Sequence, residues 1–331
     1  MFRLSLAFFL TFHFAYSQIS IKGKVVDQYT KKPIAYANIG IVNTGIGTIS
    51  NEDGSFSLQV PDVNLKDTLR LSAIGFAKKN LAIQSFFNRD LTIYLEEQIT
   101  ELNEVTVTSK KEKNKFFELG NKKSRGGTLE TDTVYAGSAT ALLIENVNPI
   151  QKDLSFPVYL KSARIRIFRN NLPSFKLRVR LYSIDSVTHC PGEDLLKKSI
   201  VVESSMKNGW VIFDFSELQF LVTKPFFVAF ERILTKKDRE LIATGFQEFM
   251  RKHPNRLKVD TVIFEGKKQV RNRLGLSGID LPGTFIGIAG NEAAKKIYKC
   301  YTRKSSFDKW EKVRGVLAAT VTVSNQPPKK L

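Results

Sequence analysis

Short runs of alternating apolar and polar residues recur along most of this chain, and this pattern constrains its fold more than any other feature. In "ISIKGKVVD" the apolar residues fall at alternate positions from Ile19 to Val25, and "FKLRVRLYSI" repeats the pattern at residues 175–184. A period of two places successive side chains on opposite faces of a strand. Because turn-forming residues separate the runs, the sequence predicts an all-β fold built from sandwiches.

The first 17 residues predict an export signal. Arg3 provides a cationic start, an apolar run covers residues 4–14, and Ala15 and Ser17 are small residues before an expected cleavage at Gln18. The run is shorter than the roughly 20 residues that cross a bilayer. We expect an exported protein with no transmembrane segment, located in the periplasm, at the outer membrane or on the cell surface. A retained N-terminal anchor is the alternative.

The remaining chain is long enough for two domains with full cores. A lysine run after residue 109, followed by "GNKKSRGG", is typical of a charged linker. The predicted organisation is a signal peptide at 1–17, a small sandwich at 18–109, a linker at 110–127, a larger β domain at 128–325 and a tail at 326–331.

Residues 18–109 read as short strands joined by turns. Asp53-Gly54 predicts a tight hairpin turn, because glycine tolerates a positive φ, with Phe56 and Leu58 facing inward beyond it. Asn51, Glu52 and Asp53 could suggest a calcium site. Calcium takes six or more oxygens, which one short turn does not supply, so we interpret this stretch as a turn.

This first segment resembles the carboxypeptidase regulatory-like domain, a transthyretin-like β-sandwich of exported bacterial proteins. The resemblance implies a docking or spacer module with a carbohydrate-binding-like fold. The positions that carry it are Gly23, Val25, Asp27, Pro33, Ala37, Ile39, Thr44, Gly47, Thr48, Asn51, Gly54, Phe56, Leu69, Ser72, Gly75 and Phe76.

The stretch "LNEVTVTSK" is similar to the segment that follows this domain in TonB-dependent outer-membrane receptors, where it leads to a plug and barrel. Here the similarity stops at Lys110. A membrane barrel needs lipid-facing strands of about 10 residues throughout. The chain instead ends in "SNQPPKKL" and contains a predicted helix at 235–252, capped by Thr235 and Asp238. We therefore expect no plug and barrel.

The second domain is again rich in strands. The candidates include "YLKSARIRIFR", "SFKLRVRLYSI", "GWVIFDF", "PFFVAFE", "KKIYKCYTR" and "GVLAATVTV". Their spacing predicts a jelly-roll-like sandwich with one helical insertion. The order of these strands resembles the galactose-binding-like jelly rolls, which implies a ligand site in loops at one end.

The net charge of +19 lies almost entirely in the second part of the chain. Residues 1–110 hold 11 Lys and Arg against 10 Asp and Glu, whereas the rest holds 40 against 22. A basic exported domain could contact an anionic envelope surface or an acidic glycan. A solvated surface is the alternative. Because the charges alternate with apolar residues in strands, we expect them on outward faces and predict no nucleic-acid binding.

No catalytic motif is present in the sequence. A zinc carboxypeptidase needs two histidines and a glutamate on the metal, but only His189 and His253 remain after export, and no His-x-x-Glu occurs. His189 precedes Cys190 in what reads as a Pro-Gly turn, and Asp214 and Glu217 read as turn residues. We predict no enzymatic activity, no cofactor and no metal.

Candidate ligand-binding residues are aromatic rings able to stack on a sugar, with a nearby cation: Trp310, Tyr301, Arg303 and Trp210. Core packing is the alternative for Trp210. The predicted function is non-enzymatic binding of a glycan or a protein partner, such as an outer-membrane protein, at the cell envelope. The alternatives are a structural accessory subunit of an outer-membrane complex and a hydrolase with a scattered site. Cys190 and Cys300 form either a disulfide or two free thiols.

Overall fold

The structure, a computed structural model, describes residues 18–87, 89–98, 114–128, 134–145, 156–264, 267–274, 281–289 and 292–327. The predicted signal peptide and the stretch "LNEVTVTSK" at residues 102–110 lie outside these ranges. Strands make up 50% of the structure and form several multi-stranded sheets, which confirms the all-β fold. Within the described ranges, no helix is long and apolar enough to cross a membrane.

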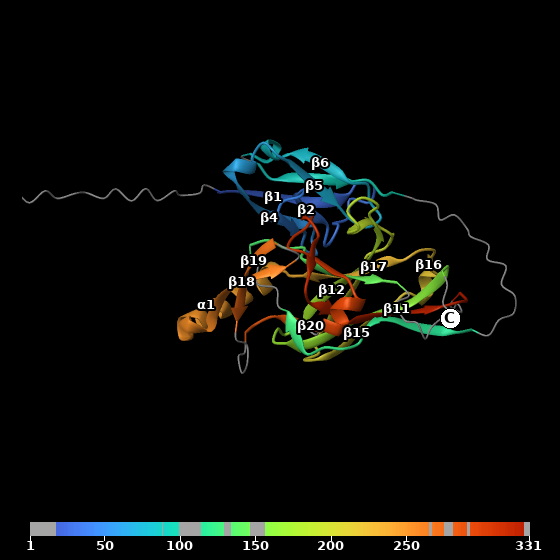
Figure 1. The fold of residues 1–331 in the computed structure, drawn as a ribbon. Helices are drawn as coiled ribbons and strands as arrows, with labels where there is room; N and C mark the ends of the chain where they lie inside the picture. Colours follow the sequence, from blue (N-terminus) through green and yellow to red (C-terminus); the bar gives the residue numbers. More distant parts are fainter. Residues whose placement is uncertain are drawn as a thin grey trace, which may run out of the picture.

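The N-terminal domain consists of two sheets that enclose an apolar core (Figure 1, blue to cyan). One sheet has the order β4-β1-β7 and the other β3-β2-β5-β6. Val25, Ile39, Leu58, Leu69 and Leu71 are buried between them, as the period-two pattern requires. The strands are β1 (Gln18–Asp27), β2 (Asn38–Ile41), β3 (Gly47–Ile49), β4 (Ser55–Pro61), β5 (Thr68–Ser72), β6 (Lys79–Ala82) and β7 (Leu91–Leu95).

The turn at Asp53-Gly54 is present, but it does not make the predicted hairpin. Gly54 has a φ of +78° and its N–H donates to the carbonyl of Asn51 at 3.0 Å, as in a tight turn. However, β3 pairs with β2 and β4 pairs with β1, so the turn carries the chain from one sheet to the other. The hairpin prediction was wrong because alternation reveals which side chains face inward but not which strand is the partner.

The second domain contains two larger sheets (Figure 1, green to red). The first has the order β13-β12-β17-β10-β21-β22, with β14 also paired to β12. The second has the order β23-β20-β11-β24-β8, with β15 and β16 on β11 and β9 on β20. The first sheet comprises β10 (Ala139–Ile144), β12 (Phe175–Ile184), β13 (Pro191–Asp194), β14 (Ile200–Ser204), β17 (Phe226–Ile233), β21 (Cys300–Arg303) and β22 (Glu311–Val313). The second comprises β8 (Phe116–Asn121), β9 (Gly126–Thr128), β11 (Val158–Asn170), β15 (Gly209–Asp214), β16 (Leu221–Val222), β20 (Thr284–Ala289), β23 (Val316–Leu317) and β24 (Ala319–Ser324).

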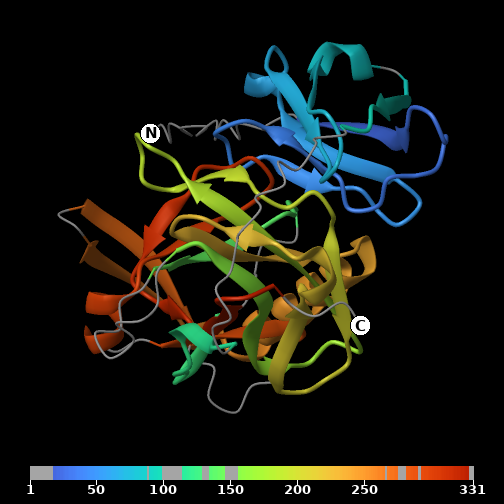
Figure 2. The same ribbon diagram turned by 90° about the vertical axis from the view of Figure 1, so that its right-hand side faces the viewer.

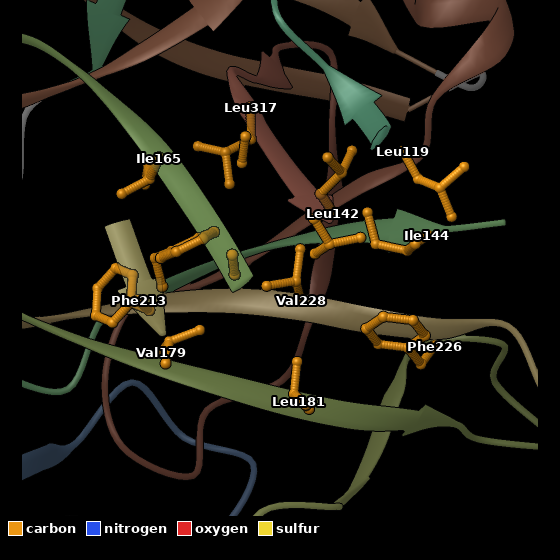
Figure 3. Close-up of a cluster of buried hydrophobic side chains, with 14 of the residues drawn as sticks. Leu119, Leu142, Ile144, Ile165, Val179, Leu181, Phe213, Phe226, Val228 and Leu317 are labelled. Carbon is orange, nitrogen blue, oxygen red and sulfur yellow. The ribbon is translucent and has the colours of Figure 1, made fainter. Parts of the chain in front are cut away.

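Apolar side chains from both of these sheets form one shared core (Figure 3). Leu142 of β10, Val179 of β12 and Val228 of β17 face Ile165 of β11 and Phe213 of β15, and all five are 0% exposed. This shared core makes the domain a sandwich. Because alternate residues of β12 and β17 point into the core, the residues between them must lie on the outer face of the first sheet.

The predicted helix is α1 (Lys236–Lys252), and it begins with a capping box. The Thr235 hydroxyl accepts from the Asp238 N–H at 3.2 Å, while the Asp238 carboxylate accepts from the Thr235 N–H at 3.0 Å. A second, six-residue helix, α2 (Glu292–Ile297), occupies the start of the stretch predicted as the strand "KKIYKCYTR". The separate hairpin of β18 (Leu257–Phe264) and β19 (Lys267–Leu274) follows α1.

Part of the predicted linker belongs to the second domain. β8 pairs with β24 along its whole length and β9 pairs with β20, so the linker prediction was wrong for residues 116–121 and 126–127. Leu119, which is 4% exposed, packs in the core, and Phe117 packs against it. The lysines on either side of this strand obscured its short alternation.

The two domains are in contact along β2 and β3 (Figures 1 and 2). The loop after β21 places Ser306 there, and its hydroxyl donates to the carbonyl of Thr48 at 3.0 Å. The N–H of Ala136 donates to the carbonyl of Gly47, and the N–H of Asn43 to that of Phe307, both at 2.9 Å. The N-terminal domain is therefore bound by its backbone to the second domain.

Glycine allows this close approach. A Cβ at Gly47 would lie 2.6 Å from the carbonyl oxygen of Ser306, whereas a Cβ at Gly45 would meet only the Asp308 carboxylate, at 3.9 Å. We expect Gly47→Ala to lower the free energy of unfolding by about 1 to 3 kcal/mol through overpacking. Gly45→Ala, the matched control, should leave it unchanged or slightly raised. Urea unfolding of both variants tests this, and equal effects would contradict the close contact.

Candidate functional site between the two domains

On the outer face of the first sheet, a row of residues across four neighbouring strands contains three charged side chains. Arg178 on β12 is opposite Glu231 on β17, Glu231 is opposite Ala139 on β10, and Ala139 is opposite Arg303 on β21. Ala139 is small, so the long side chains on either side can reach over it. The register of the sheet therefore brings together residues that are far apart in the sequence.

Glu231 lies at the centre of this row and is 0% exposed. Arg178 donates to its two oxygens from Nε at 3.1 Å and from Nη2 at 2.9 Å. Arg180 donates from Nη1 to the Glu231 Oε2 atom at 3.3 Å, and the Arg303 Nη2 atom lies 3.6 Å from the same oxygen. Arg180 also donates from Nε to Asp194 at 2.7 Å. We call these three arginines with Glu231 and Asp194 the arginine cluster.

The N-terminal domain completes the bonding of Arg178. Its Nη1 donates to the carbonyl of Tyr36 at 2.6 Å and its Nη2 to the Asn38 side-chain oxygen at 2.8 Å. Arg178 is 2% exposed. Arg178 lies on the outward face of its sheet, as the alternation in "FKLRVRLYSI" predicts, but this face is not solvated, because the N-terminal domain covers it.

The arginines determine the ionisation of Glu231. Burial alone would raise the pKa of this carboxyl, but the positive charges of Arg178, Arg303 and Arg180 outweigh burial and lower the pKa to about 2. Glu231 is therefore a carboxylate at neutral pH. The arginine cluster then contains three positive and two negative side chains, which leaves one positive charge without a compensating carboxylate.

A pocket of about 360 Å³ opens beside this cluster, and both domains line it. The N-terminal domain contributes the start of β2 and the segment after β5, and the second domain contributes β12, β13 and the end of β21. The lining residues are Asn38, Ser72, Ala73, Ile74, Gly75, Phe76, Lys78 and Gln98 from the N-terminal domain, and Arg180, Tyr182, Gly192, Glu193, Asp194, Leu195, Leu196, Lys197, Arg303 and Phe307 from the second.

Three of the four predicted site residues lie together on this face of the sheet. Arg303 lines the pocket, and its guanidinium carbon lies 5.1 Å from the centre of the Trp310 ring. Trp310 is half-buried and packs edge-on against Tyr182 at 5.7 Å, while Tyr301 is buried against Phe227 at 5.4 Å. Trp310 thus contacts two residues that line the pocket, Arg303 and Tyr182, whereas Tyr301 packs against Phe227, which does not line it.

The fourth predicted residue, Trp210, is not part of this site. It lies on β15 in the second sheet, where the guanidinium carbon of Arg164 is 4.6 Å from the ring centre. Sequence reasoning also missed the roles of Arg180, Tyr182 and Glu231. One signal was available, because Glu231 follows five apolar residues in "PFFVAFE" and a charge in such a strand is seldom buried without partners.

Among the described residues, the cysteines and His189 do not form a second site. Both cysteines are free, and burial raises the pKa of the Cys300 thiol to about 12. His189 is exposed, as expected, in a turn at residues 185–190, but Pro191 and Gly192 belong to β13, so the predicted Pro-Gly turn was wrong. In the described part of the chain, no group of three or more His, Cys, Asp or Glu side chains could hold a metal ion.

Comparison with known families supports the assignment of the N-terminal domain. Residues 21–107 match the family model of the CarboxypepD_reg-like domain, which confirms the resemblance found in the sequence. A search of curated proteins found no match to this chain. This domain family is typically extracellular or associated with the cell envelope. The first domain therefore indicates an exported or envelope β-sandwich protein.

The lowered pKa of Glu231 predicts that the folded state loses stability in acid. The folded-state pKa of about 2 lies below the ordinary value of 4.5. Its ionisation thus stabilises the fold above pH 4.5, and this contribution disappears as the pH falls from 4.5 towards 2. We expect Glu231→Gln to cost about 3 to 5 kcal/mol at pH 7, because it leaves buried arginines without their partner.

The difference in unfolding free energy between wild type and Glu231→Gln should narrow across that pH range. Urea unfolding at several pH values measures it. Glu193→Gln is the control, because Glu193 is an exposed carboxylate 3.1 Å from the Lys78 ammonium and should cost no more than about 1 kcal/mol. A difference for Glu231→Gln that stays constant down to pH 2 would contradict the assignment of its pKa.

Proposed function

We propose that this protein is an exported binding protein of the cell envelope that holds a glycan, without transforming it, in the pocket between its two domains. The observation that carries the proposal is the pocket at the arginine cluster, which both domains line. The export signal expected in the sequence and the envelope association of the CarboxypepD_reg-like family support the location.

The shape and chemistry of the pocket favour a small polar ligand over a protein surface. Its volume of about 360 Å³ lies within the range of small-molecule sites. Charged side chains line much of it, while Phe76 and Phe307 add aromatic surface. A sugar has hydroxyl groups for such polar partners and apolar C–H edges that pack against aromatic rings.

Support for binding without catalysis comes from the pairing of the carboxylates near the pocket. Glu231 is held by three arginines, Asp194 by Arg180, and Glu193 by Lys78. A general acid needs a pKa raised towards neutrality. The pKa of Glu231 is instead lowered to about 2, so this group stays ionised and engaged with its neighbours.

The proposal changes the role expected of the N-terminal domain. The sequence suggested a docking or spacer module beside a separate binding domain. The segment after β5, which includes Ile74, forms a wall of the pocket. We therefore assign binding to the two domains together.

A variant that fills the pocket tests this function. Ile74→Trp adds bulk from the N-terminal wall, so we expect the full mature chain to lose its retention on an immobilised pool of envelope polysaccharides. Val63→Trp is the matched control, because Val63 belongs to the same domain, is 85% exposed and lies outside the pocket. Retention should persist in this control.

Three outcomes would overturn the proposal. Equal retention by both tryptophan variants would place the glycan elsewhere. Release of a cleaved sugar during incubation would show an enzyme. The absence of any retention, with co-purification of an outer-membrane protein instead, would favour the structural accessory subunit.

A further inference from the structure

The arginine cluster leaves one of its cations poorly compensated. Arg178 and Arg180 each donate hydrogen bonds to carboxylates, whereas Arg303 approaches Glu231 only at 3.6 Å. Arg303 is 7% exposed, and its Nε and Nη2 atoms have no hydrogen-bond partner among the described residues. Two buried guanidinium nitrogens without hydrogen-bond acceptors are costly, so they indicate an absent acceptor.

Tyr182 lies near Arg303 and also has an unused polar group. Its ring is 4% exposed, and its hydroxyl is buried with no hydrogen-bond partner in the described part of the chain. Trp310 packs against Tyr182 at 5.7 Å and lies 5.1 Å from the Arg303 guanidinium, so one indole fixes both side chains. Arg303 and Tyr182 line the pocket.

The charge of the site selects an anion of low charge. The cluster has three arginines against two carboxylates, and the pocket lining as a whole has four cationic side chains against two carboxylates. A single carboxylate would compensate the positive charge left on the cluster. Its oxygens accept hydrogen bonds, as both a guanidinium and a phenol require.

We propose that the pocket recognises an acidic sugar through its carboxylate, which accepts hydrogen bonds from Arg303 and from the Tyr182 hydroxyl. This inference rests on the proposed function and names the ligand class for the same site. Trp310 is a positioning residue, because it holds Arg303 and Tyr182 without lining the pocket. The neighbouring Phe76 and Phe307 supply the apolar surface for the sugar ring.

Calorimetric titration of the full mature chain with D-glucuronate, and with D-glucose as its uncharged counterpart, tests the inference. Glucuronate should bind and glucose should bind at least about tenfold more weakly, because it lacks the charged acceptor. Tyr182→Phe should weaken glucuronate binding by about tenfold. It should leave urea unfolding unchanged, because the hydroxyl has no hydrogen-bond partner among the residues that the structure describes. Tyr29→Phe, which alters an exposed hydroxyl bonded to Glu96, is the matched control and should leave binding unchanged.

Arg303 provides a second test. Arg303→Lys keeps the positive charge but loses the planar set of N–H donors of the guanidinium, so glucuronate binding should weaken. Arg303→Gln also removes the charge and should abolish glucuronate binding. Equal binding of glucose and glucuronate, or unchanged affinity in Tyr182→Phe and Arg303→Gln, would overturn the carboxylate assignment. If the carboxylate assignment fails in this way but Ile74→Trp still abolishes polysaccharide retention, glycan binding in the pocket remains supported. Tighter binding of a blocked dipeptide with a free carboxylate than of glucuronate would overturn the sugar assignment.

Discussion

The burial of Glu231 among three arginines is the interaction on which the arrangement of the two domains depends. Ion pairs taken out of water gain little net stability, but removing one partner is costly, so such groups favour arrangements that satisfy all of them. Glu231 alone cannot satisfy Arg178. The remaining donors of Arg178 reach the Tyr36 carbonyl and the Asn38 side chain of the N-terminal domain. The position of that domain is therefore coupled to the charge pattern of the sheet beneath it.

The same cluster connects the fold to the pocket. Arg178 contacts the N-terminal domain, and Arg180 joins Glu231 to Asp194 at the pocket wall. The Nε and Nη2 atoms of Arg303, a residue that lines the pocket, have no hydrogen-bond partner among the described residues. A change that weakens the contact between the domains would therefore also alter the pocket. This coupling explains why two domains that each have their own apolar core share one candidate site.

The N-terminal sandwich was predictable because most of its strands have one apolar face, as at Leu58 and Leu69. The second domain was harder to predict. β10 was missed because "ATALLI" is buried on both faces and therefore shows no alternation. β8 was assigned to the linker because its short pattern lies between lysines. The partners of β3 and β4 were unpredictable in principle, since a turn sequence does not specify which sheet receives the next strand.

The candidate site also depends on strand pairing, which the sequence alone does not specify. Arg303 and Trp310 were identified because they lie close together in the sequence, but Glu231 and Arg178 meet only through the register of β12 and β17. The alternating arginines were expected on outward faces of strands, where such charges usually contact solvent. The buried glutamate in the adjacent strand argues otherwise, because a carboxylate enclosed by apolar residues requires cations on the same face. The net charge of +19 is consequently a poor guide to binding here, since the charge that matters is the small excess left after the arginines and carboxylates of one sheet face have paired.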